Sequence, residues 1–514
     1  MEMRGGPEEV AEMVSANVSA AVGRARATRW GRGQAQGRGQ VNVPLVAELL
    51  VARGRVRRRD RWRPEQVATY QRRRLDELLA FARQRSSFYR TLYQSLHRDL
   101  TAVPLAQLPP VTKGTLMSSW DDVATAPGLR LADVEQRLAQ VDEVGGDAGS
   151  AWRGRWRMAA TAGSTGQRGV FVWGPAEWLQ VLASYARVND WAGVEVGVRR
   201  RLPTAIVSTT RPSHQSAVVG ATLRNPLVPT LRLDATRPLD EIVAALNTFR
   251  PRLLVCYASM LGPLAEEQLA GRLRVGPERV ITASEETPPA ARAAALEAWG
   301  VPIVATYAAT ETATIASTCP LGSLHLYEDF VIVEPVDQDY QPVPDGELAD
   351  RVLVTVLFSR TLPLIRYELT DTVRLATEPC ACGLPFRCLA EVGGRTDDTL
   401  TLPGHAGLPV AVHPIVFHDA LAALAVHGWQ VEQTPTGLDI FVVDPARVLD
   451  LAAAQRRVAE ALESVGVGVG VGVGVGGATG LRIEVSAVDG LRRTTLGKAR
   501  LIRALAAPSP DRPS

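Results

Sequence analysis

A run of glycines and hydroxyl residues is the first part of the sequence with the chemistry to bind an anion. It extends from Thr161 to Gly169 and is followed by the apolar residues 170–172. Glycines let backbone N–H groups converge on a phosphate, and the hydroxyls of Ser164 and Thr165, next to Gly166, add donors, so no Walker lysine is needed. Taken alone, the run is equally typical of a flexible surface loop.

A second candidate is the segment Tyr307-Ala-Ala-Thr-Glu311, which follows the apolar residues 304–306. Open α/β sheets bind ligands beyond the carboxyl ends of their strands. There Tyr307 can stack on a base, Thr310 can donate to phosphate, and the Glu311 carboxylate can hold Mg²⁺ beside phosphate oxygens. The alternative is a helix start, with Thr310 as its cap and Glu311 in its first turn.

Three further polar segments follow along the chain: 363–371, 393–398 and 493–498. The first ends in Asp371, whose carboxylate can accept hydrogen bonds from both ribose hydroxyls. The last ends in Lys498. Among 57 basic residues only Lys113 and Lys498 are lysines, and because lysine is a compact point charge whereas arginine is a planar fork, a retained lysine indicates a site that needs the former.

Alternating strands and helices must position these side chains. Apolar strand patterns occur at 205–207, 253–257, 280–283 and 303–306, with helical patterns at 238–247 and 288–299. This rhythm predicts α/β layers. An amphipathic helix is expected from Pro64, and the β-rich texture of 330–375 predicts a β subdomain.

We expect three regions along the chain. Residues 1–40 lack apolar periodicity and are expected to form a disordered leader, 41–395 a large domain, and 396–514 a small α+β domain. In this small domain we expect strands at 429–432, 439–443 and 481–488, and a helix over 445–464. The Gly-Val repeat at 465–477 favours a mobile loop over a strand.

Composition limits the classes of partner. The formal net charge of +3 comes from intermixed charges, so nucleic acid is not implied, and the basic stretch 53–63 is expected to be a solvated arm. No apolar run of about 18 residues is present to span a membrane. The N-terminus also lacks a secretory signal, so a cytoplasmic protein is expected. The sequence does not indicate an oligomeric state.

Taken together and in this order, the five motifs resemble those of the adenylate-forming superfamily of acyl-CoA synthetases, adenylation domains and luciferases. Within it the sequence is similar to the phenylacetate-CoA ligase branch, over roughly residues 60–505, through the segment 108–113, Trp178, Cys319 and the segment 324–329. The resemblance implies a large N-terminal domain with a β subdomain and a small mobile C-terminal lid.

The resemblance also implies roles for single residues. Ser164, Thr165 and Gly166 would wrap the β- and γ-phosphates of ATP. Tyr307, Thr310 and Glu311 would serve adenine, the α-phosphate and Mg²⁺, and Asp371 and Arg395 would hold the ribose. Asp397 would be the hinge of the lid, and Lys498 would bridge the substrate acid and the α-phosphate, where a cation neutralises charge in the transition state.

Three positions depart from the family pattern: Gln167-Arg168 replaces the usual lysine, Ala308 replaces a glycine, and Thr370 replaces a glycine. These departures indicate a divergent member of the family. The family's acid and acceptor are therefore weaker guides to this chain than its ATP chemistry. The expected walls of the acid pocket are 257–260, 283–286 and 306–309, with Tyr257, Ser284 and Ala308 as the chosen residues.

Four cysteines and a histidine form a separate group. Cys319, His325, Cys380 and Cys382 would make a closed Cys₃His structural zinc site. Cys388 is an alternative to Cys382, and free thiols are as good an interpretation as zinc. Cys256 is expected to be a buried core thiol.

The expected reaction is activation of a small aromatic acid by ATP, with pyrophosphate release, followed by transfer to CoA with release of AMP. Two alternatives stay open. In one, the activated group passes to an amine, hydroxyl or carrier protein, and the acid can even be an inorganic acid such as nitrite. In the other, the chain is a non-catalytic nucleotide-binding homologue.

Overall fold

The computed structural model describes residues 43–96, 99–144, 148–161, 168–197, 200–395, 400–405, 408–412, 416–417, 420–421, 424, 426, 428–444, 447–469, 481–493, 499 and 501–504. The expected leader at 1–40, the residues Ser164, Thr165, Gly166, Asp397 and Lys498, and most of the Gly-Val repeat lie outside these residues. Among the described helices, none is long and apolar enough to cross a membrane.

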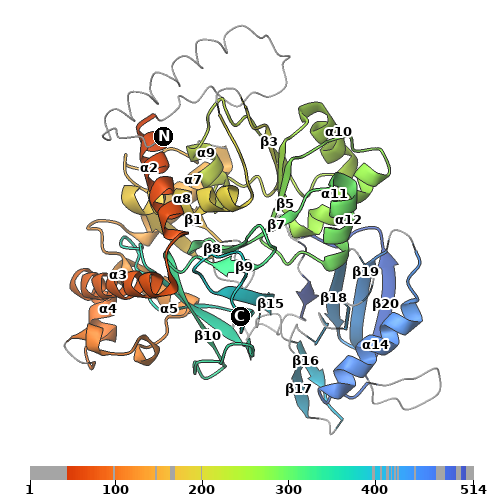
Figure 1. The fold of residues 1–514 in the computed structure, drawn as a ribbon. Helices are drawn as coiled ribbons and strands as arrows, with labels where there is room; N and C mark the ends of the chain where they lie inside the picture. The colour runs from red at the N-terminus through yellow and green to blue at the C-terminus, as the bar shows by residue number, and fades with distance from the viewer. Residues whose placement is uncertain are drawn as a thin grey trace.

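A ten-stranded sheet forms the centre of the molecule (Figure 1). Its strands, in spatial order, are β11 (Leu348–Ala349), β14 (Asp371–Leu375), β15 (Cys388–Arg395), β9 (Leu324–Leu326), β8 (Ala313–Thr318), β7 (Ile303–Ala309), β6 (Arg279–Ala283), β5 (Leu253–Tyr257), β3 (Thr204–Ser208) and β4 (Thr230–Asp234). From β4 to β7 all neighbours are parallel, and from β7 to β11 all are antiparallel. The sheet therefore changes character at β7.

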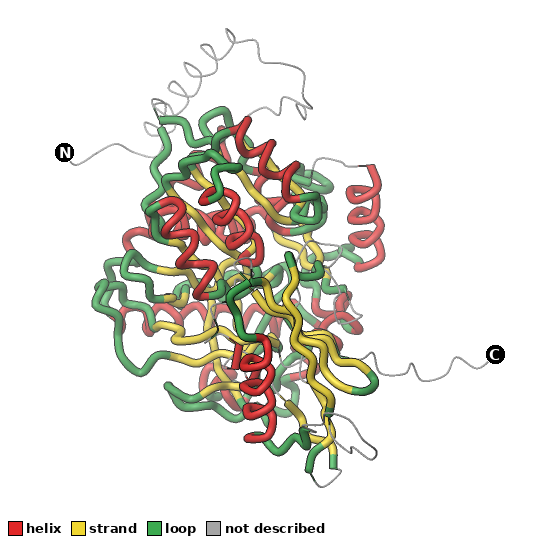
Figure 2. The backbone as a smooth tube through the Cα atoms, turned by 90° about the vertical axis from the view of Figure 1, so that its right-hand side faces the viewer, coloured by secondary structure: helices red, strands yellow, loops and turns green. Residues whose placement is uncertain are grey.

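Helices cover both faces of the parallel half (Figure 2). On one side lie α10 (Leu239–Phe249), α11 (Ala258–Leu269) and α12 (Pro289–Trp299); the other core includes α8 (Pro175–Trp191) and α9 (Gln215–Thr222). Neighbouring strand residues alternate between the two cores: Leu254 and Val280 belong to one, Leu253 and Ile281 to the other. This is the period-2 burial of a sheet packed on both sides, and it confirms the predicted α/β class.

The N-terminal part packs on this body. It contains α2 (Val43–Arg59), α3 (Pro64–Arg85), α4 (Ser87–Leu92), α5 (Lys113–Ser118), α6 (Trp120–Val123), α7 (Leu131–Val144), the short 3₁₀ turns η2 (Leu100–Ala102) and η3 (Leu105–Gln107), and the hairpin β1 (Arg157–Ala160) with β2 (Val170–Trp173). The predicted helix at Pro64 is confirmed. A three-stranded sheet of β10 (Val331–Val336), β12 (Arg351–Val356) and β13 (Tyr367–Leu369) occupies the predicted β region.

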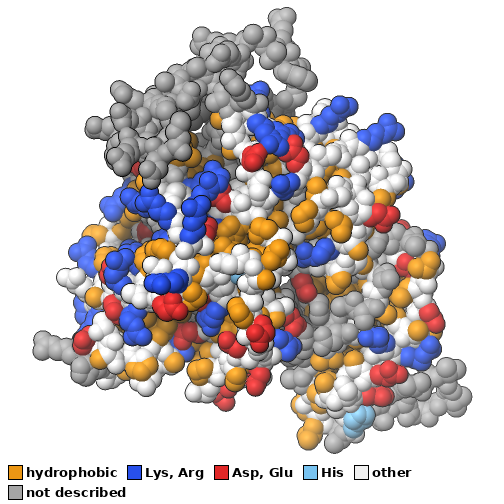
Figure 3. Space-filling model, viewed as in Figure 1, with side chains coloured by type: hydrophobic (Ala, Val, Ile, Leu, Met, Phe, Trp, Pro, Cys, Tyr) orange, Lys and Arg blue, Asp and Glu red, His pale blue; other side chains and the backbone are white. Residues whose placement is uncertain are grey.

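Ion pairs of arginine attach α2 to the body. Arg187 of α8 is fully buried and forms a two-bond ion pair with Asp329 at 2.6 and 2.8 Å, and Arg59 Nε lies 2.7 Å from the same carboxylate. Arg53 and Arg57 both bind Asp190. The expectation of a solvated arm at 53–63 was therefore wrong for these arginines, because their acidic partners lie about 130 or more positions later in the chain. Figure 3 shows acidic and basic side chains interspersed on one face.

The C-terminal part has its own sheet and core. The hairpin β16 (Leu400–Pro403) and β17 (Pro409–Val412) precedes a four-stranded sheet in the order β20 (Arg482–Val488), β19 (Gly437–Val443), β18 (Gly428–Thr434) and β21 (Ile502–Arg503). These elements and α14 (Leu451–Ser464) share a hydrophobic cluster that runs from Leu400 to Ile502. One boundary was wrong: the helix starts at Leu451, after the described non-helical residues 447–450, because the Asp450 side chain caps it at the N–H of Ala453.

Candidate active site

The ends of the glycine loop are held together by the hairpin β1–β2. Thr161 N–H donates to the Gly169 carbonyl at 2.9 Å, and Gly169 N–H donates to Thr161 Oγ1 at 2.8 Å. Arg168, which with Gln167 replaces the lysine that the resemblance predicts, donates to Asp142 and to Ser213 Oγ, at 3.2 and 2.9 Å. Asp142 and Ser213 therefore hold the Arg168 side chain.

Lys113 lies against this loop. Its Nζ donates to Thr161 Oγ1 at 3.2 Å. The absence of a side chain at Gly169 makes room for the lysine stem, because a Cβ there would lie only 3.2 Å from Lys113 Cε. The sequence marked Lys113 as one of two lysines but gave it no role; its rarity among the basic residues was the signal that points to this position.

The segment that carries Lys113 pairs with the third motif. Val111 N–H donates to the Arg366 carbonyl and Glu368 N–H donates to the Val111 carbonyl, at 2.9 and 3.0 Å, so Val111 forms a parallel bridge to Tyr367. The buried Arg366 side chain stabilises this contact, because its Nη1 donates to the carbonyls of residues 106 and 108. The phosphate-loop side of the site and the 363–371 motif are therefore one connected structure.

Tyr367 then reaches the second motif. Its hydroxyl donates to Glu311 Oε1 at 3.3 Å, and Glu311 itself is buried. The carbonyl of Thr310 accepts from Gln215 Nε2 at 2.9 Å, and Gln215 Oε1 accepts from the Tyr185 hydroxyl. The strand β7 runs on to Ala309, so Tyr307 and Ala308 lie in the strand and not beyond it; β8 begins at Ala313, so no helix starts at Thr310.

The predicted adenine and ribose residues also meet. The Tyr307 hydroxyl donates to Asp371 Oδ2 at 2.9 Å. Asp371 is the first residue of β14, where it pairs with Arg395 of β15 in the antiparallel register. Tyr307 of β7 thus contacts Asp371 of β14, whose backbone pairs with that of Arg395.

The three expected pocket residues come from neighbouring strands. Tyr257 ends β5, Ser284 follows β6, and Ala308 lies near the end of β7, with Tyr257 opposite Ala283 and Ala283 opposite Thr306. Tyr257 is buried, and its hydroxyl oxygen accepts from Thr209 N–H at 3.1 Å. Ser284 has a φ of +72°, a left-handed conformation that is rare for a residue other than glycine and is concentrated at functional sites.

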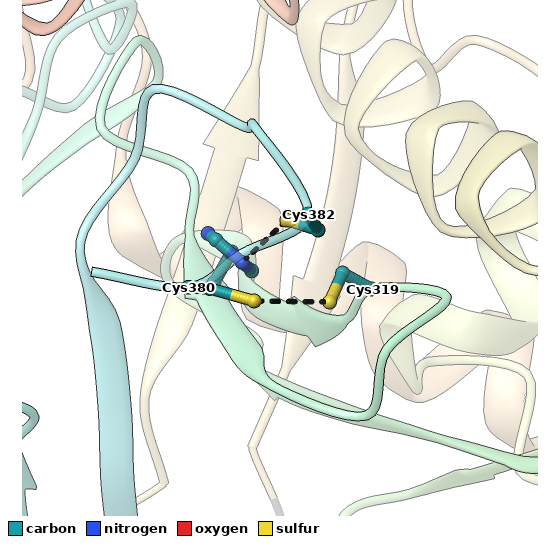
Figure 4. Close-up of side chains that lie close together, drawn as sticks. Cys319, Cys380 and Cys382 are labelled. Atoms are coloured by element: carbon teal, nitrogen blue, oxygen red, sulfur yellow. Dashed lines mark hydrogen bonds between the residues drawn. The ribbon is translucent and has the colours of Figure 1, made fainter. Parts of the chain in front are cut away.

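The cysteine and histidine side chains converge at the start of β15 (Figure 4). One potential ligand atom each from Cys319, His325, Cys380 and Cys382 lies within 4.8 Å of all the others. Cys319 Sγ is 3.9 Å from Cys380 Sγ, and Cys382 Sγ is 3.2 Å from His325 Nε2. Two thiolates bound to one zinc at about 2.3 Å in tetrahedral geometry would stand about 3.8 Å apart, so the group fits that ion.

The tautomer of His325 also suits a metal ligand. The buried ring lies with Nδ1 2.8 Å from the Phe386 carbonyl oxygen, which can only accept, so Nδ1 carries the proton and Nε2 presents its lone pair. Burial would raise the pKa of Cys380, but hydrogen bonds from the Ser323 side chain and the Cys382 backbone lower it to about 6. Cys388, the alternative ligand, lies 3.5 Å from His325 Nε2 but outside the four-residue group.

Comparison with known proteins identifies the fold. No family model matches the chain. Solved structures of 2-hydroxyisobutyryl-CoA ligase match along most of it: the postadenylation state in complex with an R3-HIB-AMP adenylate gives a TM-score of 0.64 at 18% identity, over 87% of this chain and 91% of that one. The thioesterification state, with 2-HIB-AMP and CoA, gives 0.54 at 17% identity, over 87% and 92%. The chain therefore has the fold of these CoA ligases, which is the fold that the motifs predicted.

A curated relative adds sequence similarity. The chain is 30% identical to the phenylacetate-coenzyme A ligase of Thermus thermophilus over 188 residues, which are 34% of this chain and 41% of that protein. The match thus spans less than half of the relative.

Proposed function

We propose that the protein activates a small carboxylic acid with ATP and transfers the acyl group to CoA. The observation that carries this proposal is that contacts join the separate motifs: Lys113 with Thr161, Tyr367 with Glu311 and Tyr307 with Asp371. In the first step the carboxylate attacks the α-phosphate and expels pyrophosphate. In the second the CoA thiol attacks the acyl carbonyl and AMP leaves.

Each residue has a proposed part in these steps. Asp371 and Arg395 hold the ribose, Tyr307 covers the adenine, and Ser164, Thr165 and Gly166 bind the outer phosphates. Glu311 holds Mg²⁺, which would neutralise phosphate charge, and Thr310 donates to the α-phosphate. Lys498 bridges the two reacting anions, and Asp397 is the hinge of the C-terminal lid. Tyr257, Ser284 and Ala308 line the acid pocket, and we propose an aromatic acid.

A panel of acids tests the proposal. Pyrophosphate release is measured with aromatic, aliphatic and inorganic acids, and AMP turnover with the best acid is then compared with CoA, amines or no acceptor. We expect release to require an acid and turnover to require CoA. Turnover indifferent to CoA would favour the amine, hydroxyl or carrier-protein reaction, and no release with any acid would favour a non-catalytic nucleotide-binding protein.

We also propose that Lys113 supplies the cation that the glycine loop lacks, because Arg168 is held by Asp142 while Lys113 Nζ lies at Thr161. Replacement of Lys113 by alanine is expected to lower kcat/KM for ATP by about 10²-fold, by removing a charge-assisted phosphate contact. The measurement is ATP-dependent pyrophosphate release. The control is Ser118→Ala, at the exposed end of the same helix, and equal loss in both variants would contradict the proposal.

We further propose that Cys319, His325, Cys380 and Cys382 hold a structural zinc ion. The purified protein is expected to contain about one equivalent of zinc. Cys380→Ser should lose it and lower the melting temperature, whereas Cys388→Ala should keep it. Because protons compete with zinc for the thiolates and the imidazole, the bound zinc should decrease as the pH is lowered. Metal analysis after dialysis measures the zinc content of each variant and at each pH. Full zinc retention by Cys380→Ser would contradict the proposed zinc site.

A further inference from the structure

The C-terminal unit meets the large unit beside a hollow that is mostly apolar. From the large unit it is lined by residues of α11 and by the segment that follows β6, including Pro263, Pro288 and Pro289. From the C-terminal unit Trp429 and Leu491 line it. The apolar surfaces are therefore not closely packed against each other here, and specific polar contacts have a larger share in holding the two units together.

Arg493 makes one of these contacts. Its Nη1 donates to Ser259 Oγ at 2.8 Å and its Nη2 donates to the Ser259 carbonyl at 3.0 Å. The preceding Arg492 differs: it pairs with Glu432 of its own unit at 2.8 Å and is exposed. Of two adjacent arginines, one thus binds within the unit and the other binds across to the large unit.

Glu285 makes the other contact. Its Oε2 accepts from Ser259 N–H at 3.0 Å, and its Oε1 accepts from Ala499 N–H at 2.6 Å. A single carboxylate thus joins the start of α11 to the C-terminal unit. It follows directly on Ser284, the residue with φ of +72°, and such strained positions persist where the surrounding contacts determine them.

We propose that Glu285 and Arg493 are positioning residues for adenylate formation. Arg493 binds Ser259 of α11, and Glu285 accepts from the N–H of Ala499, so residues on both sides of Lys498 in the sequence are attached next to the proposed acid pocket. Neither residue needs to touch the acid or ATP. The inference rests on the proposed function and deepens it, since it assigns these contacts to the first half-reaction and not to the second.

The test uses Glu285→Gln and Arg493→Ala in the full chain, with Arg492→Ala as the matched control. Glutamine keeps the size of Glu285 but offers one acceptor oxygen to two N–H donors. Both half-reactions are measured: acid-dependent exchange of pyrophosphate into ATP, and thioester formation from CoA and a chemically prepared acyl-adenylate. Amide hydrogen exchange of residues 258–269 is followed in parallel, without any substrate.

We expect the two variants to lower the kcat of pyrophosphate exchange by about tenfold or more, with KM for ATP within about twofold and thioester formation unchanged. Hydrogen exchange of 258–269 should rise in both variants and not in the control. Unchanged hydrogen exchange would overturn the docking contact whatever the activity, and an equal fall in both half-reactions would overturn the positioning role. If hydrogen exchange rises in the variants but the unaltered protein activates no acid, the docking contact is supported and the proposed function is wrong.

Discussion

Replacement of Lys498 by alanine is expected to abolish adenylate formation, by about 10³-fold or more in kcat, and to leave ATP binding within about threefold. The physical reason is that attack of a carboxylate on the α-phosphate brings two anions together. A cation placed between them lowers the transition state more than the bound ground state. Lysine was retained here in a chain that otherwise uses arginine for nearly all its positive charge.

The measurement is acid-dependent pyrophosphate release, with ATP binding followed by calorimetry. Lys498→Arg serves as the second variant and should also be strongly impaired, because a planar fork does not replace a compact charge at a bridging position. Arg492→Ala, which removes a charge from an ion pair within the C-terminal unit, is the control and should keep its activity. Normal pyrophosphate release by Lys498→Ala would contradict the proposed mechanism.

Replacement of Glu311 by glutamine is expected to lower adenylate formation by about 10²- to 10³-fold and to raise the Mg²⁺ concentration needed for half-maximal rate. Glutamine keeps the length of the side chain and an oxygen that can accept from the Tyr367 hydroxyl, now 3.3 Å from Oε1. It removes the charge that holds the cation. A structural role alone would therefore be largely preserved in this variant.

The measurement is pyrophosphate release as a function of Mg²⁺ concentration. Tyr367→Phe is the matched control, since it removes only the hydrogen bond to Glu311 and should cost less than the loss of the carboxylate charge. The proposal is contradicted if Glu311→Gln and the unaltered chain show the same Mg²⁺ dependence, or if the phenylalanine variant is the more impaired of the two.

Local patterns predicted the elements well. The strands now labelled β3, β5, β6 and β7 and the helices α10 and α12 were all expected from short-range apolar periodicity, which depends on neighbours a few residues apart. The four metal-binding candidates were also grouped correctly, because cysteine and histidine carry a chemical identity that survives without a structure. The end of β7 was placed too early because Tyr307 to Ala309 lack an apolar alternation.

Contacts between distant segments could not be predicted in this way. Lys113 meets Thr161, Val111 pairs beside Tyr367, and Arg493 binds Ser259 across 234 positions. Nothing in the local sequence encodes which loop meets which strand, since that follows from the order of strands in the sheet and from how two units are docked. The rarity of lysine was the one exception. Composition marked Lys113 as unusual, although its contact with Thr161 is seen only in the folded structure.

The arginine network around Asp329 has a consequence for how far the chain can be shortened. Asp329 is fully buried and is neutralised by Arg187 and by Arg59, the last residue of α2. A version that began at α3 would lose the Arg59 contact with Asp329 and, with Asp60, one of the two acidic partners of the buried Arg187. We therefore expect it to be less stable than the full chain, so expression trials should keep α2.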